Sequence, residues 1–206
     1  MDELYQNLMG PLIYKWVSNM DHAKVGRHSC SVCFCNEQYH ASIEFYQDNL
    51  LELSVYDNES KEKVFYLHFK MINMKTVTQN IQSFFHYLKG HRNFDKVDER
   101  MISHQEHLRI LLSCTAGITT SYFDYLMQET LDKYHQDIIV DAVSYYDLDN
   151  VQQDYDFILL APQASHKYLE FKQKYGNKVM TIDASDFASG NVAHVINETI
   201  SKEERV

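Results

Sequence analysis

The chain has 206 residues, a formal net charge of −10 and 45% hydrophobic residues, which is enough apolar material for one large or two small packed domains. The half after residue 105 holds 8 Lys and Arg against 16 Asp and Glu, so we expect no nucleic acid partner there. No apolar run approaches the roughly 20 residues of a membrane-spanning helix, and the first twenty residues lack a basic leader. We therefore expect a cytoplasmic protein that reaches a membrane only through a partner.

The first half predicts a small α+β domain over residues 1–104. A helix is expected over 1–20, interrupted at Gly10-Pro11, with Leu12, Trp16 and Met20 on one face. Apolar residues alternate over residues 29–69 between short polar turns, which predicts an antiparallel meander of about four strands. A helix over 76–88 and a polar linker over about 90–100 complete this half.

A cluster of cysteines in this half invites a metal interpretation. Cys30, Cys33 and Cys35 lie close to His28 and His40, and the first pair of cysteines has zinc-like spacing. A second well-spaced pair is missing, and the cluster falls within a predicted strand. We therefore interpret these residues as buried strand thiols and predict no metal site. The chain has four cysteines and no secretory signal, which favours free thiols in a reducing compartment.

The second half predicts an α/β domain over residues 105–206, because strand patterns alternate with helical ones. The expected strands cover about 108–113, 138–143, 156–161 and 178–183, and the expected helices about 120–134, 147–153, 164–175 and 191–202. This order predicts a four-stranded, parallel, doubly wound sheet. Ligands of such sheets bind beyond the carboxyl ends of the strands.

Cys114 follows the first of these strands and precedes a helix, so it is the candidate nucleophile. The backbone N–H groups of a tight turn and of a helix's first turn form a concavity for phosphate and favour a thiolate over a thiol. The predicted phosphate-binding residues are Thr115, Ala116, Gly117, Ile118, Thr119, Thr120 and Ser121. The alternative is a buried structural thiol at a strand end, which is a common position for free cysteine.

The residue six positions after the cysteine separates two phosphoryl chemistries. Thiol phosphatases place an arginine there, which grips the phosphate and stabilises the transition state of its removal. Here this position is Thr120. Such a loop is expected to hold a phosphoryl group for an acceptor and to hydrolyse it poorly. A thiol reductase is also disfavoured, because no resolving cysteine lies near Cys114.

The sequence from Cys114 to Ser121, Cys-Thr-Ala-Gly-Ile-Thr-Thr-Ser, resembles the phosphorylation loop of the IIB component of the lactose/cellobiose class of the bacterial sugar phosphotransferase system. That loop typically has the sequence Cys-Ser-Ala-Gly-Met-Ser-Thr-Ser. Leu159-Leu-Ala-Pro162-Gln163 is similar to the family's Leu-Gly-Pro-Gln, and Ile182-Asp183 to the end of its fourth strand. The resemblance makes Pro162, Gln163 and Asp183 possible supporting residues, although Asp183 is also a natural turn or capping residue.

The resemblance implies a phosphocarrier, a protein-phosphocysteine sugar phosphotransferase without a cofactor. Cys114 would accept a phosphoryl group from a histidine of a IIA phosphodonor. It would pass this group to a sugar of the β-glucoside or galactoside class at a membrane IIC permease. The alternative is a regulatory sensor, in which the IIB-like domain reports phosphotransferase flux to a partner of residues 1–104.

Overall fold

The computed structural model describes residues 3–25, 30–90, 96–102, 107–115, 118–134 and 137–203. The chain divides into two compact units, Met1–Phe85 and His86–Val206. Among the described residues, no helix combines the length and apolar character needed to cross a membrane.

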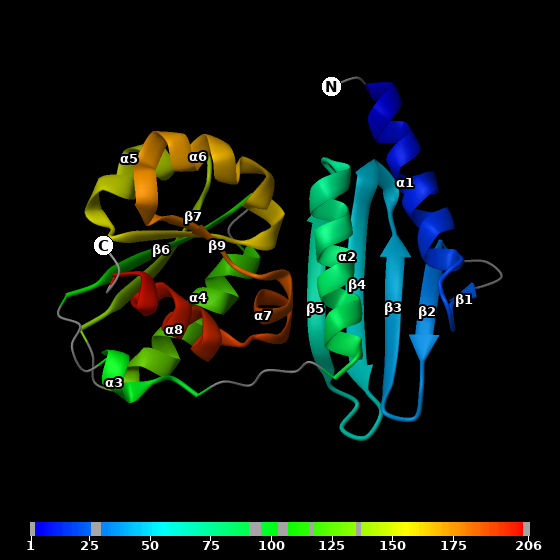
Figure 1. Cartoon of the computed structure of the whole chain (residues 1–206), viewed down its shortest axis with the longest axis horizontal. Coiled ribbons are helices and arrows are strands. Elements are labelled where there is room, and N and C mark those ends of the chain that lie inside the picture. Colours follow the sequence, from blue (N-terminus) through cyan, green and yellow to red (C-terminus); the bar gives the residue numbers. More distant parts are fainter. Residues whose placement is uncertain are drawn as a thin grey trace. The chain divides into compact units, whose positions relative to one another are not determined.

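The first unit is a five-stranded antiparallel sheet with the order β1-β2-β3-β4-β5. Its strands are β1 (Lys24–Val25), β2 (Ser31–Cys35), β3 (Tyr39–Phe45), β4 (Leu50–Asp57) and β5 (Lys63–Lys70), with the short helix η1 (Gln47–Asn49) before β4. Helices α1 (Glu3–Ser18) and α2 (Met74–Leu88) lie over one face (Figure 1). The expected meander is confirmed, and the short β1 extends it by one strand.

Alternation along the strands explains which face the helices cover. In β2, Val32 and Phe34 are buried, whereas the alternating Ser31, Cys33 and Cys35 are half-buried on the other face. Phe34 meets Phe85 of α2 edge to face at 4.9 Å between ring centroids. Such aromatic contacts join the sheet to α2 and add to the free energy of apolar burial.

Helix α1 differs from its prediction in two respects. It continues through Pro11 without a break. Its core-facing residues are Met9, Ile13 and Val17. Packing of this stripe against the sheet outweighs the hydrogen bond that proline removes. Leu12 and Trp16, which we expected to share one face, are 58% and 36% exposed.

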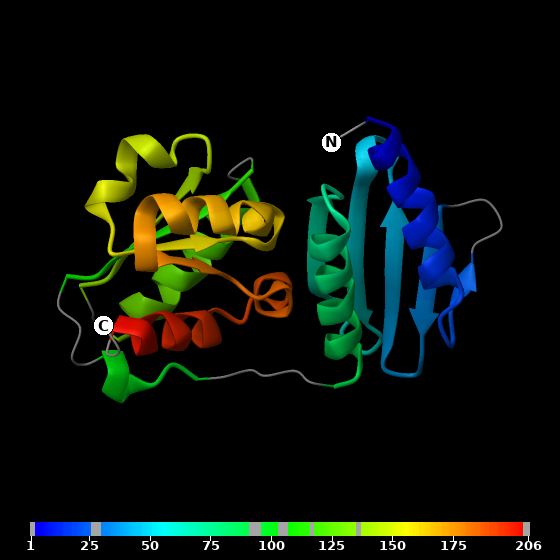
Figure 2. The ribbon, with the colours of Figure 1, turned by 45° about the horizontal axis from the view of Figure 1, so that its top comes forward.

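The second unit is a four-stranded parallel sheet with the order β7-β6-β8-β9, as predicted. Its strands are β6 (Arg109–Cys114), β7 (Ile139–Ser144), β8 (Phe157–Leu160) and β9 (Val179–Thr181). Its helices are α3 (Glu99–Ile102), α4 (Ile118–Asp132), α5 (Leu148–Val151), η2 (Gln152–Asp154), η3 (Pro162–Lys167), α6 (Tyr168–Tyr175), η4 (Gly176–Lys178), α7 (Ala184–Ser189) and α8 (Val192–Glu203). Helices α4 and α8 cover one face, and α5 and α6 the other (Figure 2).

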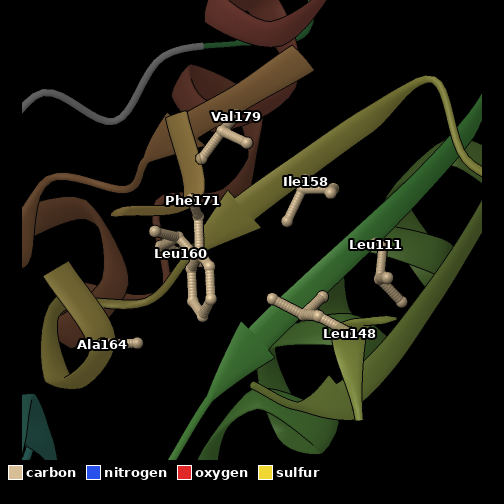
Figure 3. Packing of buried hydrophobic residues seen from close by; sticks show 7 residues of the cluster. All are labelled: Leu111, Leu148, Ile158, Leu160, Ala164, Phe171 and Val179. Atoms are coloured by element: carbon tan, nitrogen blue, oxygen red, sulfur yellow. The ribbon is translucent and has the colours of Figure 1, made fainter. Parts of the chain in front are cut away.

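The face under α5 and α6 carries a continuous apolar cluster (Figure 3). Its buried members are Leu111, Leu148, Ile158, Leu160, Ala164, Phe171 and Val179. They come from three neighbouring strands and from α5, η3 and α6. This cluster fixes η3 against the sheet, directly after the carboxyl end of β8.

One local detail differs from the predicted elements. The helix expected from residue 164 is divided into η3 and α6, which ends at Tyr175 and is followed by Gly176 with a φ of 77°.

On the other face of the sheet, the side-chain amide of Gln128 in α4 bonds to the backbone at the free edge of β7. Its Oε1 accepts from Val140 N at 2.9 Å, and its Nε2 donates to Ile138 O at 3.2 Å. Strand β7 therefore has a partner for part of its outer backbone.

The segment from Lys96 to Ile102 contacts α8. Asn197 of α8 donates to Lys96 O and accepts from Asp98 N, both at 2.9 Å. Val97 and Ile102 are buried. The predicted linker therefore ends in ordered structure, including the first residues of α3.

These contacts make a prediction about fragments. We expect residues 86–206 to unfold cooperatively without the first half. Residues 105–206, the domain expected from the sequence, should also fold but be less stable by roughly 2 to 4 kcal/mol, because Val97 and Ile102 no longer bury their side chains. Urea unfolding of both fragments measures the difference. Two equally stable fragments would show that this segment contributes nothing, and two unfolded fragments would show that the halves share one core.

Candidate functional site

Cys114 is the last residue of β6, which lies between β7 and β8 inside the sheet. Its side chain is 1% exposed, and its Sγ lies 3.0 Å from Oγ1 of Thr120. Thr120 is in the first turn of α4 and is fully buried. The pair of side chains therefore links the carboxyl end of the strand to the amino end of the helix.

The end of β7 holds the backbone of Cys114 and of the residue after it. Tyr145 N donates to Cys114 O at 2.8 Å, and Ser144 Oγ donates to Thr115 O at 3.3 Å. The sequence analysis did not identify Ser144 or Tyr145. Both residues could have been predicted from their position directly after a strand, because the carboxyl ends of neighbouring parallel strands meet at one edge of the sheet.

The remaining predicted loop residues are described only in part. Ala116 and Gly117 lie outside the described residues. Ile118 and Thr119 begin α4, and only their backbone is described. Ser121 is exposed in the same helix. The α4 amino end therefore begins four residues after the thiol, as expected for an anion-binding turn.

Pro162 and Gln163 lie at the same edge. Ala161 N donates to Ser113 O at 2.9 Å, and Pro162 then begins η3. Gln163 is 9% exposed, and its Oε1 has no hydrogen-bond partner among the described residues. Its backbone carbonyl bonds with Nδ1 of His166 at 3.1 Å, and burial lowers the pKa of that imidazole. His166 is a further residue that the sequence analysis missed.

Asp183 acts as the cap of α7. Its Oδ1 accepts from Ser185 N at 2.7 Å, which satisfies a donor of the first helical turn. Helix α7 then contacts α4, where Phe187 stacks on Phe123 with ring centroids 5.0 Å apart. The geometry therefore gives Asp183 a structural role in the segment that supports α4.

The helix that follows Cys114 carries a half-buried acidic side chain. Asp124 lies one helical turn after Thr120, and burial together with Asp141 of β7 raises its pKa to about 6. Arg109 is at the opposite, amino end of β6. Thr120 thus leaves the thiol with a neutral hydroxyl partner at the position where a thiol phosphatase has a guanidinium.

The thiols of the first unit are more exposed than predicted. Cys30 is exposed, and Cys33 and Cys35 are half-buried on the sheet face away from the helices. Cys35 Sγ lies 2.9 Å from His40 Nδ1 on the neighbouring strand. The predicted burial was wrong because the strand alternation places these thiols opposite the core. In the described part of the chain, no three His, Cys, Asp or Glu residues are placed to hold a metal ion, and His28 lies outside that part.

Comparison with known proteins adds an independent finding for the second half. Residues 109–198 match the family model described as the lactose/cellobiose-specific IIB subunit of the phosphotransferase system.

Two solved structures are similar to the same half. One is the lactose-specific IIB domain from Streptococcus pneumoniae, with 17% identity, a TM-score of 0.40, and coverage of 49% of this chain and 97% of that one. The other is the cellobiose-specific IIB protein from Borrelia burgdorferi, with 26% identity, a TM-score of 0.42, and coverage of 48% and 93%. The family match confirms the resemblance seen in the Cys114 loop: residues 109–198 are similar to the lactose/cellobiose-specific IIB subunit.

Proposed function

We propose that the C-terminal half is a phosphocarrier that accepts a phosphoryl group on Cys114 from a histidine of a IIA protein. It passes this group to a sugar bound by a membrane IIC permease. The observation that carries the proposal is the placement of Cys114 at the carboxyl end of an inner strand, bonded to Thr120 in the first turn of α4. This placement lies within the residues that match the IIB family.

The proposed chemistry consists of two displacements at phosphorus. In the first, Cys114 Sγ attacks the phosphorus of the phosphohistidine, an S–P bond forms, the N–P bond breaks, and the thiol proton goes to the leaving imidazole nitrogen. In the second, a sugar hydroxyl attacks phosphorus, the S–P bond breaks, and the sugar's proton returns to the thiolate. A covalent intermediate divides one transfer into two easier steps. The backbone N–H groups of residues 115–121 would hold the phosphoryl oxygens.

The partner of the thiol explains why this site would carry the group without hydrolysing it. The Thr120 hydroxyl can donate to a thiolate but brings no positive charge to the phosphoryl oxygens. One oxyanion-type donor is worth about 3 to 4 kcal/mol in rate, or about 100- to 1000-fold. The transfer to water therefore lacks the stabilisation that an arginine supplies in a phosphatase.

Labelling from a phosphorylated protein tests the proposal. A lactose/cellobiose-class IIA protein is charged with radioactive phosphate through the general phosphotransferase proteins and mixed with the full chain. We expect one labelled cysteine, no label on Cys114→Ser, normal labelling of the control Cys35→Ser, and negligible turnover of aryl phosphates. Robust phosphatase activity that depends on Cys114 would contradict the carrier. Absence of label with every IIA protein of this class would favour a regulatory or inactive domain.

The same assay tests Thr120. Thr120→Val keeps the shape but removes the hydroxyl, and a hydrogen bond to a charged group is worth about 1.5 to 3 kcal/mol, so labelling should slow about 10- to 100-fold. Thr120→Ser keeps the hydroxyl and should stay near the rate of the original chain. Equal rates for Val and Ser would show that the hydroxyl has no part in the transfer.

Asp124 gives a pH-dependent prediction. Its pKa is raised from 3.8 to about 6, so the folded state binds a proton more tightly than the unfolded state. This contribution to stability is therefore lost as the pH rises from about 4 through about 6. The shift would correspond to about 3 kcal/mol for a buried group, which solvent screening reduces to roughly 1 kcal/mol at this half-exposed carboxyl.

Asp124→Asn should therefore stabilise the chain by roughly 1 kcal/mol at about pH 7.5 and by less at about pH 4.5. Urea unfolding at both pH values measures this, with the exposed Glu198→Gln as control. The variant should also carry more phosphoryl group at equilibrium, because one negative charge near the dianion is removed. A stability gain that is equal at both pH values would refute the electrostatic explanation.

One observation favours the regulatory alternative as a second candidate. Leu8, Leu12 and Trp16 follow one another at intervals of four residues along α1, and all three are exposed. An apolar stripe of this kind is a common contact surface for another protein. If the first unit reports the state of Cys114, phosphorylation should change hydrogen exchange in α1. Unchanged exchange throughout Met1–Phe85, with Cys114 fully labelled, would contradict the regulatory alternative.

A further inference from the structure

Gln163 and Ser113 are buried polar residues at the carboxyl edge of the sheet, and each has a side-chain oxygen without a hydrogen-bond partner among the described residues. Gln163 is 9% exposed, and its atom without a partner there is Oε1. An unsatisfied buried polar atom destabilises the folded state, whereas an apolar side chain of similar size would avoid this cost. The amide is therefore a poor choice for packing alone.

The backbone around this side chain is firmly held. Ala161, two residues earlier, donates its N–H to the carbonyl of Ser113, the residue before Cys114. The Gln163 carbonyl bonds with His166, and Ala164 is buried in the apolar cluster of Figure 3. Helix η3 thus fixes the Cα of Gln163 at the edge where β6 ends.

We infer that the Gln163 amide contacts the phosphoryl group on Cys114, donating an Nε2 hydrogen to one of its oxygens. This inference rests on the proposed phosphocarrier function. Rotation about the last side-chain torsion exchanges Nε2 and Oε1 without moving the backbone, so a group that arrives as an acceptor can select the donor end of the amide. The dianion has three strong acceptor oxygens, which exceed what the Thr120 hydroxyl alone can satisfy.

A neutral amide suits a carrier better than a cation does. It supplies a directional hydrogen bond to the phosphoryl oxygens, while the charge on them remains uncompensated by a guanidinium. The phosphoryl group is therefore positioned for its acceptor and is still able to leave. The same geometry explains why Gln163 stays polar although the resting structure gives its Oε1 no partner.

The test compares stability with phosphoryl transfer in the full chain. Gln163→Met keeps the volume and removes the amide, and should slow labelling by the phosphorylated IIA protein about tenfold. Its unfolding midpoint should stay unchanged or rise, since an unsatisfied polar atom is removed. Gln163→Glu keeps the shape but presents acceptors only, so it should slow labelling further than Met. Gln173→Met, at an exposed position of α6, is the matched control and should change neither quantity.

Phosphorus NMR of the labelled chain adds a readout that a structural role would not change. The phosphocysteine resonance should shift in Gln163→Met relative to the original chain and to Gln173→Met. Equal labelling rates and resonances for Gln163→Met and the original chain would overturn this inference while leaving the carrier intact. Absence of label on Cys114 in the original chain would instead overturn the proposed function. If Gln163→Met fails to fold, Gln163→Glu alone decides between slowed and unchanged labelling.

Discussion

The contact between Cys114 and Thr120 is the constraint on which the candidate site depends. Both side chains are buried, and each gives the other a polar partner at 3.0 Å. A thiol without such a partner at the end of an inner strand would be an ordinary packed cysteine. With it, the end of β6 is held to the first turn of α4, whose N–H groups have no acceptors within the helix.

The other segments at the carboxyl edge serve this arrangement by holding backbone. Ser144 and Tyr145 bind the carbonyls of Thr115 and Cys114, Ala161 binds the carbonyl of Ser113, and Asp183 caps the helix that packs on α4. Nearly all of these contacts are neutral hydrogen bonds. Neutral donors in a preorganised site can hold an anion without neutralising it. The half-buried Asp124 acts in the opposite direction, because its charge disfavours a second anion nearby.

Periodicity predicted the strands, their parallel order and the position of Cys114 at an edge, because these depend on short-range patterns and on general rules of α/β sheets. The roles of Ser144 and Tyr145 depend on contacts with Thr115 and Cys114, about 30 residues earlier in the chain, which no local pattern encodes. The predicted interruption of α1 at Pro11 was wrong, because the packing of the helix against the sheet outweighs the low helix propensity of proline. The supporting roles of Pro162 and Gln163 stay predictions.

In the first unit, two glutamates on neighbouring strands each accept a hydrogen bond from a tyrosine hydroxyl. Glu44 and Glu52 lie directly opposite each other on β3 and β4, an arrangement in which like charges destabilise a sheet. Tyr46 donates to Glu44 at 2.8 Å and Tyr66 to Glu52 at 3.4 Å, and the first bond raises the pKa of Tyr46 to about 12. These two glutamates therefore have hydroxyl donors from nearby tyrosines, and the Cys114 thiol likewise has a hydroxyl partner in Thr120. The buried Oε1 of Gln163 has no such donor among the described residues, and its backbone begins at the carboxyl end of β8, where Ala161 N bonds to the carbonyl of Ser113.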